Sequence, residues 1–263
     1  MTSIYSLCSS SKGNCTYIGD QSKGILIDCG IGIRIFTNYM QTYDIAQDAL
    51  QAIFITHEHT DHIKGLSAIL KKWNVPVYAS RETLEELVAK DAVSSSANLN
   101  EINKRSVCYA DMEISAFTTP HDSVHSLGYK LITNEQKQAC ICTDLGYMPD
   151  EVYDNLKGSD FVLLESNYDE TMLKMGGYPY FLKQRILSES GHLSNENCTH
   201  TLKRLINDGT TNFLLGHLSE QNNLPHLALS SAVDGLSEIG AIHKKDYTLS
   251  VAPVRSIGAV VNF

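Results

Sequence analysis

Residues 54–62 read Phe-Ile-Thr-His-Glu-His-Thr-Asp-His, an apolar run that ends in three imidazoles and two carboxylates. Neutral imidazole and carboxylate oxygen are ligands of zinc, manganese and iron. In an extended turn, His57 and His59 project to the same side. We expect Asp61 and His62 to open a helix that continues to Lys71, which lets one short segment serve two neighbouring metal ions.

Two other interpretations of this segment can be weighed from the sequence. It is not the His-Glu-x-x-His motif of zinc proteases, because Asp61 stands where that motif has its second histidine. The second interpretation is that the segment is a solvated turn that happens to be rich in histidine and binds no metal. Against it, the candidate ligands along the chain each follow or end a strand-like run: Asp28, His57, His121, Asp144, Glu165 and His217. Strand ends hold side chains rigidly at one edge of a sheet, so the pattern predicts a catalytic or binding site there.

Strand-like runs dominate both halves of the chain, with helical patterns between some of them. The runs cover residues 3–8, 15–19, 24–28, 52–56, 75–79, 114–119, 128–133, 139–144, 161–165, 212–216 and 247–251. One helical face holds Cys198, Leu202 and Leu205, with Ser194 as its N-cap and Gly209 just past its end. This order predicts an α/β fold of four layers, with two mixed sheets face to face and helices outside.

The composition indicates a globular chain without a membrane segment. Of 263 residues, 43% are hydrophobic and 19% charged, and no apolar run approaches the length that spans a membrane. The N-terminus lacks the pattern of a signal peptide. The net charge of −9 argues mildly against general nucleic-acid binding but does not exclude a nuclease, because bound divalent cations would supply positive charge where a phosphate sits.

Seven cysteines lie mostly in or beside strand-like runs, and none forms a Cys-x-x-Cys pair. We interpret them as buried thiols in a reducing compartment, which predicts a cytoplasmic protein.

The His-x-His-x-Asp-His signature after an apolar strand resembles that of the metallo-β-lactamase-fold hydrolases, and the rest of their motif series can be placed over residues 28–217. The resemblance implies two divalent metal ions per chain, zinc, manganese or iron. One would be held by His57, His59 and His121, the other by Asp61, His62 and His217, with Asp144 bridging both. Asp28 would orient a ligand histidine without touching the metal. His125 competes with His121, which we prefer because it directly follows its strand.

The interval between Asp144 and His217 indicates the branch of the superfamily. It is too short for the extra domain of the β-CASP nucleases, so we expect residues 1–263 to form one domain without a β-CASP insertion. The stretches 9–14, 164–170, 177–179, 182–186, 191–195 and 216–223 resemble the bacterial YycJ/WalJ group. That resemblance implies a 5′-to-3′ exonuclease on double-stranded DNA that is linked to mismatch repair.

Four further residues have candidate roles. His192 occupies the place of a catalytic histidine in the phosphodiesterase branches, where it would stabilise developing charge or protonate the leaving oxygen; a structural histidine before a helix is the alternative. Glu165 can position His192 or a water, or simply end a strand. Lys183 and Arg185 can meet substrate phosphates, or lie on a solvated helix face.

The hypothesis is hydrolysis of a phosphodiester by a metal-bridged hydroxide, which Asp61 would hold in place or help to form by accepting the proton of the bound water. One alternative is a small-molecule hydrolase of the same fold, acting on a thioester, lactone or cyclic phosphodiester. The other is a non-catalytic, metal-bound scaffold in cell-wall signalling, which the complete ligand set disfavours. The sequence leaves the identity of the metal and the oligomeric state open.

Overall fold

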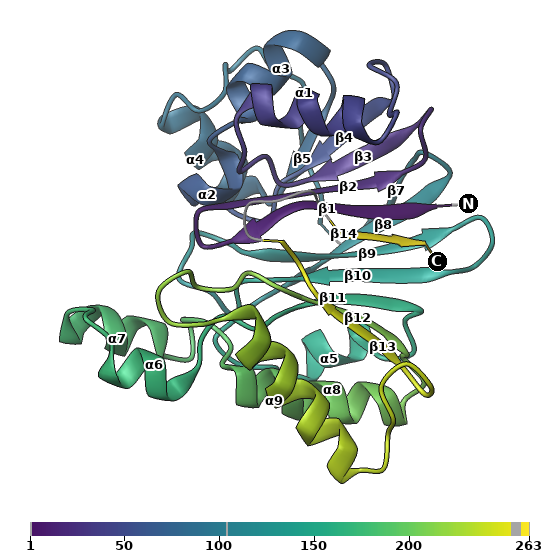
Figure 1. Ribbon diagram of the computed structural model, residues 1–263. Coiled ribbons are helices and arrows are strands. Elements are labelled where there is room, and N and C mark those ends of the chain that lie inside the picture. The colour runs from purple at the N-terminus through teal and green to yellow at the C-terminus, as the bar shows by residue number, and fades with distance from the viewer. Residues whose placement is uncertain (1, 104, 254–258, 263) are drawn as a thin grey trace.

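Two seven-stranded sheets lie face to face in the computed structural model, which describes residues 2–103, 105–253 and 259–262 (Figure 1). The first sheet has the spatial order β14 (Ala259–Asn262), β1 (Ser3–Ser10), β2 (Gly13–Gly19), β3 (Gly24–Ile27), β4 (Leu50–Phe54), β5 (Val77–Ala79) and β6 (Leu99–Glu101). The second has the order β13 (Thr248–Val251), β12 (Asn212–Gly216), β11 (Phe161–Glu165), β10 (Gln138–Cys142), β9 (Leu127–Thr133), β8 (Met112–Thr118) and β7 (Val107–Tyr109). Both sheets combine parallel and antiparallel pairs, which confirms the predicted mixed sheets.

Helices cover the outer face of each sheet, so the predicted four layers are confirmed (Figure 1). The first sheet carries α1 (Ile33–Thr42), α2 (Thr60–Ile63), α3 (Leu66–Trp73) and α4 (Arg81–Ala89). The second carries α5 (Asp150–Leu156), α8 (Asn195–Asn207) and α9 (Pro225–Glu238). Two short helices, α6 (Glu170–Met175) and α7 (Tyr180–Ile186), project beyond the layers at one end of the molecule. We call residues 169–187 the α6–α7 projection.

The central strands are apolar on both faces because each sheet is covered twice. In β3, Ile25 and Ile27 pack between the two sheets, where Phe54 and Tyr129 join them. Leu26, between them in sequence, packs on the opposite face under the helices. This alternation arises because successive side chains of a strand point to opposite faces. It therefore also sets the direction of the side chain that follows the end of each strand.

The candidate ligands follow the strand ends as predicted, and three of them adopt a left-handed backbone. Asp28 follows β3, Asp144 follows β10 and His217 follows β12, with φ of 61°, 58° and 55°. Residues other than glycine rarely adopt this conformation, although Asp and His tolerate it better than most. Such conformations concentrate at functional sites, where the surrounding structure holds them in place.

Two predictions need correction. The helix expected from Asp61 to Lys71 is broken, because α2 ends at Ile63 and α3 begins at Leu66. At the break, Gly65 donates its N–H to the carbonyl of Cys29. Its Cα also lies so close to Ile31 that a Cβ at residue 65 would be only 1.9 Å from the carbonyl oxygen of Ile31.

The cysteines are also less uniformly buried than expected. Cys108 on the edge strand β7 is exposed and Cys8 is half-buried, while Cys15, Cys29, Cys140, Cys142 and Cys198 are buried.

Among the described residues, no helix is long and apolar enough to cross a membrane.

Candidate metal centre

His57, His59 and His121 form the first group of candidate ligands, and their nearest ring nitrogens lie within 4.8 Å of one another. Nε2 of His57 lies 2.9 Å from Nδ1 of His59, and Nε2 of His121 lies 3.3 Å from the same atom. Nδ1 of His121 donates to the carbonyl oxygen of Gly191 at 3.1 Å, which turns Nε2 toward the group. The structure thus brings together the three histidines that the sequence predicts for one metal ion.

Asp61, His62 and His217 form a second group next to the first. Oδ2 of Asp61 lies 3.4 Å from Nε2 of His62 and 3.4 Å from Nε2 of His217. His62 lies in α2, in the first half of the chain, and His217 directly follows β12, in the second half. The group therefore joins the two halves of the chain. These are the three side chains predicted for the other metal ion.

Asp144 lies between the two groups. Its Oδ2 is 3.3 Å from Nε2 of His62, and its Oδ1 is 3.5 Å from Nε2 of His217 and 3.7 Å from Nε2 of His121. The side chain is buried, yet Oδ2 has no hydrogen-bond partner among the described residues. A buried carboxylate oxygen without a partner is costly, and a divalent cation among these imidazoles would satisfy it. The residues present therefore fit a metal centre.

Asp28 and Thr56 contact the Nδ1 atoms of His62 and His57, the ring nitrogens that do not face the other candidate ligands. Oδ2 of Asp28 accepts a hydrogen bond from Nδ1 of His62 at 2.7 Å, which directs Nε2 into the second group. Oδ1 of Asp28 accepts from the backbone N–H of Thr56 at 2.8 Å. The hydroxyl of Thr56 lies 3.0 Å from Nδ1 of His57. Asp28 therefore lies where its predicted role requires, and Thr56 is a further positioning residue that sequence reasoning missed.

Glu165 connects His192 with His217. Its Oε1 lies 2.8 Å from Nδ1 of His192 and 2.7 Å from Nδ1 of His217. Its Oε2 accepts the backbone N–H groups of Leu145 at 3.0 Å and Leu193 at 3.1 Å. Every oxygen of this fully buried carboxylate is thus partnered. The contacts favour the positioning role for Glu165 over that of a plain strand-end carboxylate.

Two asparagines that the sequence analysis did not single out also touch the cluster. Nδ2 of Asn14 donates to the carbonyl of Ser10 at 3.0 Å and lies 3.3 Å from Oδ2 of Asp61. Nδ2 of Asn167 donates to the carbonyl of His217 at 2.7 Å. Both lie in stretches that carry the YycJ/WalJ resemblance, which was the available signal for them.

The charges of the cluster suit a cation. Burial alone would raise the pKa of the carboxyls of Asp61 and Asp144, but the imidazoles of His62 and His217 outweigh it, and both pKa values lie below the usual range. Burial lowers the pKa of His57, and the neighbouring imidazoles lower it further. Burial alone would lower the pKa of His62 and His217 as well, but the neighbouring carboxylates outweigh it and raise both pKa values. These two imidazoles would therefore release a proton when a divalent metal binds, because the metal takes the neutral ring.

The structure separates the remaining candidates. Arg185 pairs with Asp122, next to His121. Nζ of Lys183 instead donates to the carbonyl of Lys174 at 2.7 Å, on the α6–α7 projection.

The two rivals for one ligand position also differ. His125 belongs to none of the candidate ligand groups among the described residues, and its ring is held by Glu82 at 3.0 Å and by Thr118 at 3.1 Å. The preference for His121 therefore agrees with the geometry.

A cleft of about 130 Å³ opens beside the cluster, lined by His192, Asp122 and Ser219 and by Tyr178 and Arg185 of the α6–α7 projection.

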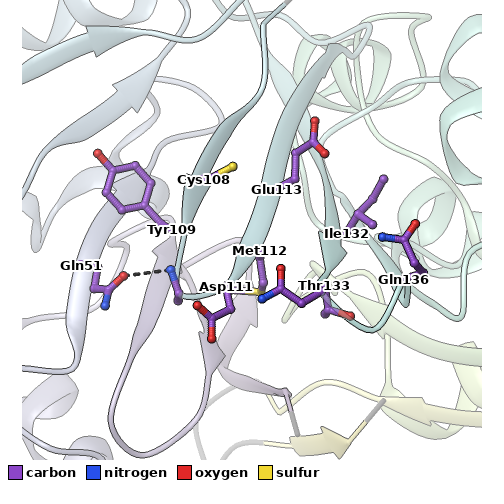
Figure 2. A pocket seen from close by; sticks show the side chains of 11 residues that line it. Gln51, Cys108, Tyr109, Asp111, Met112, Glu113, Ile132, Thr133 and Gln136 are labelled. Carbon is purple, nitrogen blue, oxygen red and sulfur yellow. Dashed lines mark hydrogen bonds between the residues drawn. The ribbon is translucent and has the colours of Figure 1, made fainter.

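A larger cavity of about 430 Å³ lies elsewhere, around the β7–β8 hairpin and the turn after β9 (Figure 2). Its described lining includes Asp111, Glu113 and Gln136 but no histidine. At its edge the backbone N–H of Ala110 donates a hydrogen bond to the side-chain oxygen of Gln51. The candidate metal ligands therefore adjoin the smaller cleft and not this cavity.

Comparison with known proteins now adds to this geometry. A family model described as a beta-lactamase superfamily domain matches residues 23–217. The chain belongs to the beta-lactamase superfamily. With the histidine and aspartate cluster, this membership confirms the predicted metallo-β-lactamase fold and metal-dependent hydrolase.

Within the superfamily, the chain is similar to two bacterial enzymes. It is 34% identical over 237 residues to the exodeoxyribonuclease YycJ of Bacillus anthracis, a match that covers 89% of each chain. It is 33% identical over 236 residues to the exodeoxyribonuclease WalJ of Streptococcus pneumoniae, covering 88% of this chain and 87% of that one. The predicted resemblance to the YycJ/WalJ group is thereby confirmed.

Solved structures support the fold alone. The metallo-beta-lactamase fold protein YhfI of Bacillus subtilis superposes with a TM-score of 0.73 at 15% identity, covering 99% of this chain and 98% of that one. Zinc-bound PqqB of Methylobacterium extorquens superposes with a TM-score of 0.72 at 13% identity, covering 100% of both.

Proposed function

We propose that this chain is a two-metal phosphodiesterase that digests double-stranded DNA from the 5′ end. The observation that carries the proposal is the cluster itself, in which Asp144 lies between two adjacent groups of three candidate ligands. Two-metal sites are a recurrent solution for phosphodiester hydrolysis. The DNA substrate and its polarity are supported by the two relatives, both of which are named exodeoxyribonucleases.

The ligand assignment follows the geometry. One divalent ion is proposed at His57, His59 and His121 and the other at Asp61, His62 and His217, with Asp144 shared. Bound ions of this kind polarise a phosphoryl oxygen and lower the pKa of water. Zinc, manganese and iron all accept this donor set.

The residues of the chain have separate tasks. Asp61 faces both His62 and His217 and is proposed to orient the attacking water or accept its proton. His192 lines the cleft while Glu165 holds its Nδ1, so its Nε2 can face substrate and protonate the leaving oxygen. Asp28 and Glu165 are proposed to act as positioning residues. Arg185, on the cleft wall, is proposed to contact substrate phosphate, and Lys183 is a weaker candidate because it does not line the cleft.

The setting of the enzyme remains part of the proposal. We expect one domain over residues 1–263, a cytoplasmic location and a role in DNA repair, as the sequence indicated. The oligomeric state stays open.

The test uses metal-loaded protein and duplex DNA labelled at either the 5′ or the 3′ end. Loss of the 5′ label as mononucleotides before the 3′ label is expected. His59→Ala should abolish this digestion, while His125→Ala, a matched change outside the cluster, should retain it. A panel of thioesters, lactones and cyclic phosphodiesters tests the small-molecule alternative. Turnover of one of these without digestion of DNA would overturn the proposal.

A further inference from the structure

The three most exposed large hydrophobic side chains among the described residues all lie on the α6–α7 projection. Met175 is 83% exposed, Tyr180 77% and Phe181 74%, whereas the next, Ile35 and Ile242, are each 52% exposed. Single exposed hydrophobic residues are ordinary, but a group on one short segment marks an interaction site. The projection extends from the layered body at the end where α2 lies (Figure 1).

The projection is folded, so this exposure is not a sign of loose structure. Leu173 and Ile186 of the projection form a small core with Tyr168, the residue that precedes it, and Tyr178 and Leu182 pack against this core. The side chain of Asp169 caps α6 by accepting the N–H of Met172 at 2.8 Å, and the N–H of Asp169 donates to the carbonyl of Asn222 at 2.8 Å. Tyr180 and Phe181 are therefore presented on a supported surface.

The projection that carries this surface also lines the cleft beside the metal centre. Tyr178 and Arg185 of the projection form one wall of the cleft that His192 also lines. At about 130 Å³, the cleft is below the roughly 300–1,000 Å³ of pockets that enclose a drug-sized ligand. It can admit a phosphate group, while the base attached to that nucleotide must stay outside, along the rim that α7 forms.

The projection is slightly basic within a chain whose net charge is −9: it carries Lys174, Lys183 and Arg185 against Asp169 and Glu170. Lys174 is paired with Glu170 and Arg185 with Asp122, so a phosphate here would compete with these carboxylates. A locally basic segment with exposed aromatic rings is the composition of surfaces that bind single-stranded nucleic acid, where bases stack on the rings.

We propose that Tyr180 and Phe181 form a stacking platform for bases at the end of the DNA strand whose phosphate enters the cleft. The proposal rests on the proposed function and adds to it the surface that seats an opened duplex end. Tyr180 and Phe181 are consecutive in a helix, so their rings point in different directions and each can take a base of its own. Stacking is tolerant of sequence because every base has a π-face.

The first experiment measures binding. A duplex with 2-aminopurine at its 5′ end and phosphorothioate linkages to resist cleavage is titrated with the metal-loaded protein. Wild type should quench the 2-aminopurine fluorescence. The variant Tyr180→Ala/Phe181→Ala should lose the quenching and bind about tenfold more weakly, the scale expected from losing a base–aromatic stack. Ile242→Ala, which removes an exposed hydrophobic side chain outside the projection, should match wild type.

Further variants distinguish stacking from other uses of the surface. Phe181→Leu keeps apolar area but removes the ring, so it should weaken duplex binding as Phe181→Ala does. All these variants should hydrolyse bis(p-nitrophenyl) phosphate at the wild-type rate, because neither ring belongs to the metal cluster. Wild-type binding and quenching by the alanine double variant would overturn the proposal. So would a loss of self-association in that variant with unchanged duplex affinity, which would assign the surface to a second copy of the chain.

The outcomes also separate this inference from the proposed function. If wild type binds and quenches the duplex end but never cleaves unmodified DNA, the platform stands and the nuclease proposal fails. If wild type digests DNA and the alanine variants digest it with unchanged KM, the nuclease proposal stands and the platform fails. If wild type does not bind the duplex, the platform is rejected.

Discussion

The metal cluster and the α6–α7 projection lie side by side at one cleft but are built in opposite ways. Asp28, Asp144 and Glu165 are buried in the cluster, and Asp28 and Glu165 are held by hydrogen bonds from neighbouring backbone or side chains. On the projection, Tyr180 and Phe181 are mostly exposed above a core of only three buried residues. The cluster is preorganised for chemistry, whereas the projection offers surface. We therefore expect substitutions in the cluster to change turnover and those on the projection to change binding.

Removal of the shared carboxylate should have the largest effect. Asp144→Asn keeps the size of the side chain but loses the charge that faces His62 and His217. We expect kcat on a phosphodiester to fall about a thousandfold or more. The measurement is steady-state hydrolysis of bis(p-nitrophenyl) phosphate, with far-ultraviolet circular dichroism to show that the fold persists. Asp150→Asn, at an exposed site on α5, is the matched control. Full activity in Asp144→Asn would show that Asp144 is not part of the metal site.

A smaller loss is expected when a positioning residue is changed. Asp28→Asn alters the acceptor that holds Nδ1 of His62 without removing a ligand. Metal affinity should fall about 10–100-fold, as is typical when the partner of a metal-bound histidine is lost. Competition with a chromophoric chelator measures it, and Asp111→Asn, an exposed aspartate paired with Lys23, is the control. Unchanged metal affinity would mean that Asp28 serves the fold alone.

Withdrawal of the metal should affect the cluster more than the projection. The ions bind the folded state, so chelation should lower the melting temperature by about 5 °C or more. Limited proteolysis of the projection around Gly176 should proceed at the same rate with and without chelator, because none of the side chains in its core is a candidate ligand. If chelation instead accelerated cleavage there, the projection and the cluster would be one cooperative unit.

The smallest effects should distinguish Arg185 from Lys183. Arg185→Ala removes a cation from the cleft wall and should raise the KM for duplex DNA about three- to tenfold, while reducing the slope of log Kd against log salt by about one. Lys183→Ala should change KM less than about twofold, because its ammonium is turned to the carbonyl of Lys174. Equal losses in the two variants would indicate a diffuse electrostatic surface rather than a specific contact.

Much of the fold and the cluster could be predicted from sequence because both depend on strongly patterned residues. Apolar strands buried on both faces appear as continuous runs, and the ligands His57, Asp144 and His217 follow their ends. The supporting residues were harder to predict. Thr56 and Asn14 are residue types common in any turn, and only their contacts with His57 and Asp61 reveal their part in the site.

The missed break between α2 and α3 has a different cause. The helical pattern continues through Gly65, but the chain must pass close to Ile31 there, a tertiary constraint that periodicity does not contain. The sequence indicated a possible helix face at Lys183 and Arg185 but not the projection as a whole. Tyr180 and Phe181 are exposed, so the division of their helix into a polar and an apolar face is weak.

The central claim is that the cluster holds two divalent ions around Asp144, and a metal-replete crystal structure with anomalous scattering and a bound nucleotide tests it most directly. The account predicts one ion at His57, His59 and His121, a second at Asp61, His62 and His217, a carboxylate oxygen of Asp144 on each, and the nucleotide phosphate between them. A single ion, or one seated instead among Asp144, Glu165, His192 and His217, which also lie close enough to hold a cation, would contradict it.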